Sequence, residues 1–202
     1  MKIKEFLFLV IVASCFSVNA QQLGVRAGVS LSNTQVELNG IDTKLYVGFN
    51  IGAISDFNLP FAGWKINTGL LFSNQGFALK QDYGNNSGVT YNFTTNTIEV
   101  PVNVRKEFNL FIVKQYIQAG LYSSYALSGR IKDGDTSHSL DFKKNTDRYD
   151  TGFSIGGGTF LTPKIQILIN YDHGFTKSKI NFGDQVIVSK DRRWGLSAVY
   201  MF

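Results

Sequence analysis

Apolar residues recur at every second position in eight segments of the chain, and none of the segments shows convincing amphipathic helical spacing. In the segment 23–31, Leu, Val, Ala, Val and Leu alternate with small or polar residues. This period is that of a β-strand with one apolar and one polar face. The alternation predicts strands at 23–32, 45–53, 64–73, 98–105, 117–122, 153–158, 165–172 and 194–202.

The connections between these segments alternate strictly in length. Long polar connections are expected at 33–43, 80–90, 129–148 and 177–191, and shorter ones at 58–63, 107–113 and 161–164. This arrangement predicts an all-β fold, an eight-stranded antiparallel up-and-down transmembrane β-barrel with short periplasmic turns and long extracellular loops. Both ends of residues 21–202 then lie on the periplasmic side.

A water-soluble, lipocalin-like carrier has the same number of strands and is the main alternative. The polar face of the predicted strands is mainly Gly, Ser, Asn and Gln with a few isolated charges. Such small groups suit the crowded interior of a narrow barrel, whereas a solvated surface is richer in Lys, Glu and Thr. The composition of this face therefore favours the membrane barrel.

The first 20 residues have the pattern of a secretory signal peptide. Lys2 and Lys4 precede a short apolar run, and small residues end at Ala20. Cleavage there leaves 21–202 as one outer-membrane β-barrel domain. In a second interpretation, Cys15, which is the only cysteine, is the lipidated first residue of a lipoprotein.

Charge and cysteine content exclude several other classes of protein. The formal charge of +5 is spread along the chain, without the concentrated basic stripe of a nucleic-acid binder. Cleavage after Ala20 leaves no cysteine for a disulfide or a metal ligand. No metal-ligand spacing, phosphate-binding glycine loop or nucleophile elbow is present, so no cofactor is expected. The "GGG" at 156–158 is predicted to permit a bend or a bulky neighbour inside the barrel.

Aromatic residues are frequent, with 17 Phe and nine Tyr, and many of them gather near predicted strand ends, as expected for two interfacial girdles. The C-terminal strand, with Trp194, Tyr200 and a final Phe202, also resembles the signal read by the barrel-assembly machinery, although Ser197 replaces its common Gly. The expected periplasmic girdle comprises Phe57, Phe61, Trp64, Phe108, Phe111, Tyr116, Phe160, Tyr200 and Phe202. The expected outer girdle comprises Tyr46, Phe77, Tyr91, Phe93, Tyr125, Tyr149 and Phe175.

Six stretches, in this order and spacing, resemble the PorT-like family of small bacterial outer-membrane β-barrel proteins. They are "GLLFSNQGF", "IEVPVNVRKEF", "QAGLYSSYALSG", "GFSIGGGTF", "NYDHGF" and the terminal strand. The chain departs from this family at Gln75 and Asn170, where the family often has cations. The resemblance implies the fold and the outer membrane of a Gram-negative cell envelope, and only loosely a link to secretion.

Glu99 is the most informative charge predicted to face the interior. A buried carboxylate needs a cation, and Arg26 is the expected partner, because Arg105 lies six residues along the same strand, about 20 Å away. The favoured interpretation is a polar plug; a gated ion path is the alternative. The plug residues are Arg26, Lys65, Glu99, Asn103, Arg105, Gln118 and Asp172.

The two histidines, His138 and His173, are candidate catalytic groups, because some small outer-membrane barrels modify lipids with Ser and His. Ser178 and Ser189 lie near His173 in the sequence, but Asp172 and His173 are predicted to face opposite sides of their strand. The sequence therefore favours a protein that is not an enzyme.

The predicted loops are where binding is expected. The third loop is balanced in charge, whereas the fourth has an excess of cations that is expected to face lipopolysaccharide phosphates or, alternatively, a protein partner. These cations are Lys177, Lys179, Lys190, Arg192 and Arg193. The resulting hypothesis is a structural or interaction component of the outer membrane; a small porin-like pore is the alternative, and a lipid-modifying enzyme is less favoured.

Overall fold

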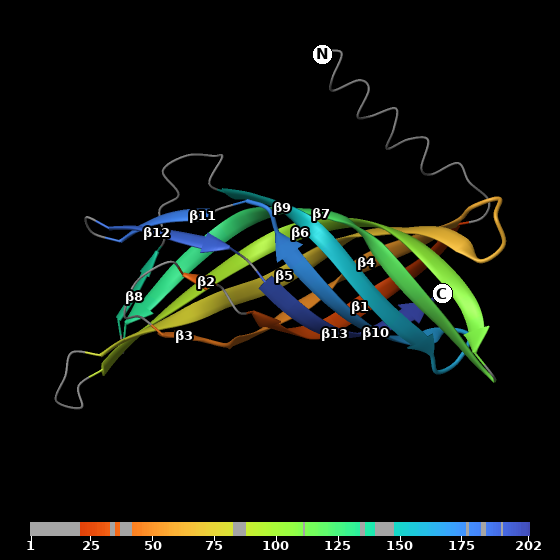
Figure 1. Cartoon of the computed structure of the whole chain (residues 1–202), viewed down its shortest axis with the longest axis horizontal. Helices are drawn as coiled ribbons and strands as arrows, with labels where there is room; N and C mark the ends of the chain where they lie inside the picture. Colours follow the sequence, from red (N-terminus) through yellow and green to blue (C-terminus); the bar gives the residue numbers. More distant parts are fainter. Residues whose placement is uncertain are drawn as a thin grey trace, which may run out of the picture.

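The computed structural model is an antiparallel β-barrel closed by its first and last strands (Figure 1). Residues 1–20, on which the signal-peptide and lipidation predictions fall, lie outside the part of the chain that the structure describes. Within the described part, no helix is long and apolar enough to cross a membrane. The described residues are 21–32, 35–36, 42–82, 88–110, 112–133, 136–139, 148–176, 178–182, 185–190 and 192–202.

Eight strands form the barrel wall, and each pairs with its neighbours in the chain. The last wall strand pairs with the first, from Gly24 opposite Met201 to Ser32 opposite Arg193. The predicted eight-stranded up-and-down barrel is therefore confirmed. The wall strands are β1 (Gln21–Ser32), β4 (Tyr46–Asn58), β5 (Trp64–Asp82), β6 (Gly88–Leu110), β7 (Val113–Asp133), β9 (Tyr149–Phe160), β10 (Ile165–Gly174) and β13 (Arg192–Met201).

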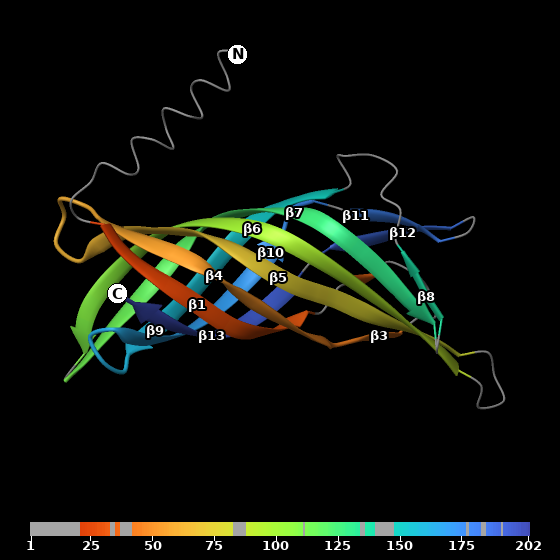
Figure 2. The ribbon, with the colours of Figure 1, turned by 180° about the vertical axis from the view of Figure 1, so that it is seen from behind.

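The short connections lie at one end of the barrel, called here the turn end, together with Gln21 and Phe202 (Figure 2). The turn between β4 and β5 contains Gly63, whose φ of 73° favours glycine. The connection predicted at 107–113 is shorter than expected, because β6 continues to Leu110 and pairs there with Val113 at the start of β7.

The opposite end, called the loop end, contains more strand than the sequence predicted. β5 and β6 stay paired up to Asp82 and Gly88, inside the connection expected at 80–90. The other long connections also contain short strands, because backbone pairing needs no apolar face and the polar composition of a segment does not prevent it. These strands are β2 (Gln35–Val36), β3 (Asp42–Lys44), β8 (Thr136–Ser139), β11 (Ser178–Phe182) and β12 (Gln185–Lys190).

The two faces of the wall differ as the alternation predicts. Apolar side chains of the outward face, such as Leu23, Val29 and Leu196, are about half exposed, whereas inward side chains such as Ser197 and Asn103 are buried. A lipocalin-like carrier would line its interior with the apolar set. That alternative is therefore wrong for this chain.

Some predicted girdle residues lie elsewhere. Phe77, Phe93 and Tyr116 are buried, because they occupy inward positions of β5, β6 and β7, and the rings of Phe77 and Phe93 stack with centroids 4.7 Å apart. Trp194 pairs with Tyr171 at the loop end, far from the chain terminus that it was grouped with. At the turn end the exposed rings are Phe61, Trp64, Phe108, Tyr200 and Phe202; Phe111 and the side chain of Tyr91 lie outside the described residues.

Candidate functional site in the barrel interior

The inward face gathers its charges at three levels between the loop end and the turn end. Each level is built from side chains that alternate with outward apolar residues, so the same period that makes the strands also points these groups inward. A polar group in such an interior needs a partner, because an unpaired buried charge or hydrogen-bonding group is costly. The three levels account for most of the predicted plug residues.

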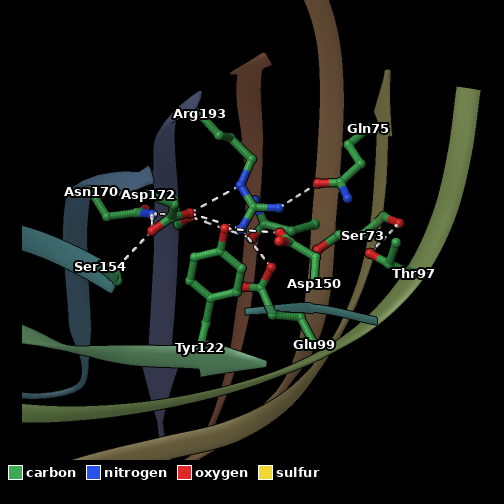
Figure 3. A network of polar contacts seen from close by, with 12 residues as sticks. Ser73, Gln75, Thr97, Glu99, Tyr122, Asp150, Ser154, Asn170, Asp172 and Arg193 are labelled. Carbon is green, nitrogen blue, oxygen red and sulfur yellow. Dashed lines mark hydrogen bonds and ion pairs between the residues drawn. The ribbon is translucent and has the colours of Figure 1, made fainter. Parts of the chain in front are cut away.

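Arg193 of β13 is the centre of the first level, nearest the loop end (Figure 3). Its guanidinium forms ion pairs with Glu99 of β6 and with Asp172 of β10, at 2.5 Å and 2.8 Å. It also donates a hydrogen bond of 2.7 Å to Gln75 Oε1 on β5. Since β6 and β13 are four strands apart in a ring of eight, the pair with Glu99 joins opposite walls of the barrel.

Asp172 connects this centre to the neighbouring strands. Ser154 Oγ donates to Asp172 Oδ1 at 2.6 Å, and Asn170 Nδ2 donates to both carboxylate oxygens. Asn170 Oδ1 in turn accepts a hydrogen bond of 2.9 Å from Arg26. Asn170 and Gln75, the two positions where the chain departs from the PorT-like pattern, therefore lie in one network around Arg193.

The predicted pairing of Arg26 with Glu99 is wrong. Arg26 is buried, but its guanidinium donates to Asn170 and to Ser197 Oγ, the latter at 3.0 Å. Arg193, expected from the sequence to belong to the basic fourth loop, is the cation that pairs with Glu99. The reason is its register: it occupies an inward position of β13, between the outward residues Arg192 and Trp194.

Arg105 of β6 is the centre of the second level. It forms an ion pair of 2.9 Å with Asp56 of β4, and both side chains are almost completely buried. It donates to Gln118 at 2.9 Å and to Gln166 at 3.3 Å, and its guanidinium carbon lies 4.1 Å from the centroid of the Tyr116 ring. Arg105 thus contacts side chains from three other strands.

The third level lies near the turn end. Glu107 of β6 forms ion pairs with Lys65 of β5 at 3.0 Å and with Lys114 of β7 at 2.7 Å. Lys65 also donates to Gln22 Oε1 on β1, at 3.2 Å. Lys65 and Glu107 are mostly shielded, whereas Lys114 is partly exposed.

Two tyrosines fill space beside glycines of β9. A Cβ at Gly158 would collide with the Tyr116 ring, and a Cβ at Gly152 would lie 2.5 Å from the Tyr122 ring. Tyr122 donates to Asp150 at 3.0 Å, and its ring lies 5.6 Å from the Arg193 guanidinium carbon. Of the two roles predicted for the glycines at 156–158, a bend or a bulky neighbour, the bulky neighbour is therefore confirmed at Gly158.

The interior also contains buried polar side chains beyond the predicted plug residues. Ser154 and Gln166 occupy inward positions of predicted strands, which the period alone indicates, whereas Asp56 lies beyond the strand predicted at 45–53 and became recognisable only because β4 continues to Asn58. Arg193 shares that property and was missed because it adjoins a polar segment. All seven predicted plug residues lie on the inward face, with Asn103 buried between the first two levels.

The remaining predicted site residues lie outside the interior. Arg192 is on the outward face of β13. Lys177 and the side chains of Lys179 and Lys190 lie outside the described residues, as do the side chains of His138, Ser178 and Ser189.

His173 is outward and packs near Phe153, while Asp172 faces inward, so these neighbours form no catalytic pair. Within the described part of the chain, no group of three or more His, Cys, Asp or Glu residues is arranged to hold a metal ion.

A closed barrel with an apolar outer face and a polar, side-chain-filled interior defines an integral membrane β-barrel. The chain belongs to the outer membrane protein beta-barrel domain family, whose model matches residues 18–179. It is accordingly an outer-membrane β-barrel protein. No curated protein matches the chain.

Three solved structures show the same fold at low sequence identity. OprG from Pseudomonas aeruginosa is 10% identical, with a TM-score of 0.52, over 91% of this chain and 96% of that chain. A major outer membrane protein from Thermus thermophilus is 14% identical, with a TM-score of 0.52, over 91% and 100%. Neisserial surface protein A is 14% identical, with a TM-score of 0.51, over 89% and 97%.

Proposed function

We propose that the protein is a non-enzymatic structural or interaction component of the outer membrane that acts through its loop-end surface or its turns. The observation that carries this proposal is the closed interior. Arg193 joins opposite walls through Glu99, and Arg105 joins three further strands at a second level. Function therefore resides on the outer surfaces, where other molecules have access.

The same interior argues against the porin-like alternative. Eight strands leave a lumen that side chains fill. An ion crossing it would have to separate the Arg193–Glu99 pair and then the Arg105–Asp56 pair, both buried. Breaking a buried pair costs about 3–5 kcal/mol when one partner is left uncompensated.

Single-channel recording of the purified protein in planar bilayers tests this proposal. We expect a closed trace from the parent protein. Insertion is checked on the same sample by a heat-dependent shift in gel mobility, which folded membrane barrels show. Discrete conductance steps from the parent protein would overturn the proposal and establish the pore.

An enzymatic role is tested separately through His173. Its ring packs 5.3 Å from that of Phe153, and its Nδ1 lies 3.4 Å from the hydroxyl of Tyr171. These contacts place the imidazole within a group of outward aromatic rings. We expect His173→Ala to leave the lipid A profile of cells carrying the protein unchanged; a changed profile would indicate a lipid-modifying enzyme.

The proposal extends to the partners of the chain. The resemblance to the PorT-like family supports a role beside secretion or adhesion machinery. The outward C-terminal residues Tyr200 and Phe202 support recognition by the barrel-assembly machinery, and a protein partner at the loop end remains part of the hypothesis. We expect the protein in the outer-membrane fraction, and Phe202→Ala to lower its yield there without lowering its synthesis.

A further inference from the structure

One patch of the outward surface combines a cation with a group of rings. It lies at the loop end of three adjacent strands and comprises Phe153 of β9, Tyr171 and His173 of β10, and Arg192 and Trp194 of β13. The residues of β10 and β13 alternate with buried inward ones, so these side chains belong to the outward face. We call this set the loop-end patch.

The rings of the loop-end patch are in mutual contact. The centroids of Tyr171 and Trp194 are 5.0 Å apart, and those of Phe153 and Tyr171 are 6.5 Å apart. The imidazole of His173 lies beside Phe153, at 5.3 Å. Trp194 is more than half exposed, so the group presents an open aromatic surface.

Arg192 has a buried hydrogen-bond donor, its Nε, without a partner in the described part of the chain. It stands opposite His173 in the pairing of β10 with β13, so its side chain adjoins the rings. A guanidinium carries five donors in a planar fork that matches phosphate, and leaving a buried donor unpaired is costly.

The surroundings determine what kind of anion fits. Towards the turn end, the patch continues into the exposed apolar residues Leu196 and Ile169. A partner that satisfies both parts is amphipathic, with an anionic head beside Arg192 and an apolar body along these side chains. Aromatic residues occupy the membrane interface for the same reason.

We propose that the loop-end patch binds a membrane lipid whose phosphate headgroup carries a net negative charge with no offsetting cation, with Arg192 donating to the phosphate and the rings of Tyr171 and Trp194 packing against the adjoining part of the lipid. This inference deepens the proposed function, on which it rests for the placement of the outward face in the membrane. The proposed site is therefore more specific than the general attraction between cations and lipid phosphates, because a single side chain, Arg192, recognises the phosphate.

The test uses Trp194 as a reporter of the lipid beside it. The chain has two tryptophans, so Trp64→Phe leaves Trp194 as the sole tryptophan, whose emission is excited selectively over that of the tyrosines. This protein is refolded into phosphatidylcholine vesicles that contain either brominated phosphatidic acid or brominated phosphatidylcholine, since bromine quenches a tryptophan that it contacts. The quenching curves give the relative affinity of the two lipids for the surface around Trp194.

We expect brominated phosphatidic acid to be preferred by about threefold to tenfold, the range of a charge-assisted hydrogen bond reduced by competition with water. Arg192→Gln in the same background should remove the preference. Lys106→Gln is the matched control: Lys106 is also an outward cation beside an aromatic position, residue 64, but it lies at the turn end, so its replacement should leave the preference unchanged. Refolding of each variant is checked by the gel shift.

No preference at Trp194, or a preference that survives Arg192→Gln, would overturn the site. Either result would leave the proposed function intact, because that depends on the closed lumen measured by conductance. Conductance through the parent protein would overturn the proposed function. A lipid preference that depends on Arg192 would still support the lipid site in that case.

Discussion

Replacing Arg193 by Met should destabilise the barrel strongly. The substitution keeps an unbranched apolar stem but removes the guanidinium that pairs with Glu99 and Asp172 and donates to Gln75. Asp172 keeps its hydrogen bonds from Ser154 and Asn170, whereas Glu99 loses the ion pair that joins it to the opposite wall. Two buried carboxylates then share one level of the lumen.

The size of the effect follows from these contacts. Removing one partner of a buried ion pair costs about 3–5 kcal/mol, and here the lost cation served two carboxylates. We expect a loss of about 4 kcal/mol in the free energy of unfolding. With a denaturant slope of about 2 kcal/mol per molar urea, the midpoint should fall by about 2 M.

The assay is urea titration of the protein refolded into lipid vesicles, followed by tryptophan fluorescence. Lys114→Met is the matched control, because Lys114 also pairs with a carboxylate, Glu107, but its side chain is 44% exposed. An exposed pair contributes at most about 1 kcal/mol, so the control midpoint should move little.

Glu99→Gln added to Arg193→Met sharpens the test. The amide removes one of the two uncompensated charges, so the double variant should recover at least about 1 kcal/mol over Arg193→Met alone. A free energy of unfolding for Arg193→Met within about 1 kcal/mol of that of the parent protein would refute this role of Arg193. A further loss of unfolding free energy on adding Glu99→Gln would refute it as well.

Two further predictions use the same titration. Gly158→Leu should lower the free energy of unfolding by about 1–3 kcal/mol or more, because the leucine side chain would displace the Tyr116 ring. Gly157→Ala is the control: its Cβ meets only a backbone oxygen at 3.5 Å, so the free energy of unfolding should change by less than about 0.5 kcal/mol. Equal effects of the two substitutions would argue against a filled interior. On the outward face of β1, Ala27→Arg at mid-strand should cost about 2–4 kcal/mol and Leu23→Arg near the turn end about 0–1 kcal/mol. Equal costs at the two depths would contradict the membrane placement of this face.

The alternation of side chains determined most of the fold from the sequence alone. A period of two over eight segments implies strands with one apolar face, and the polar face of Gly, Ser, Asn and Gln indicated which side is inside. Alternating connection lengths placed both ends of 21–202 at the turn end, and all seven predicted plug residues lie on the inward face. The alternation and the connection lengths depend only on residues that are close in the sequence, so the sequence alone was sufficient to predict them.

Only the tertiary structure decided which charges meet. Arg26 was expected to neutralise Glu99, but closure of the sheet places β13 across the lumen from β6, and Arg193 reaches Glu99 instead. The sequence states which residues face inward, but not the height that each reaches in the barrel, because that depends on the register of eight pairings around a closed ring. Trp194, by contrast, lies at the loop end beside Tyr171, and this follows from the sequence, because eight residues of strand place it about 26 Å from Phe202.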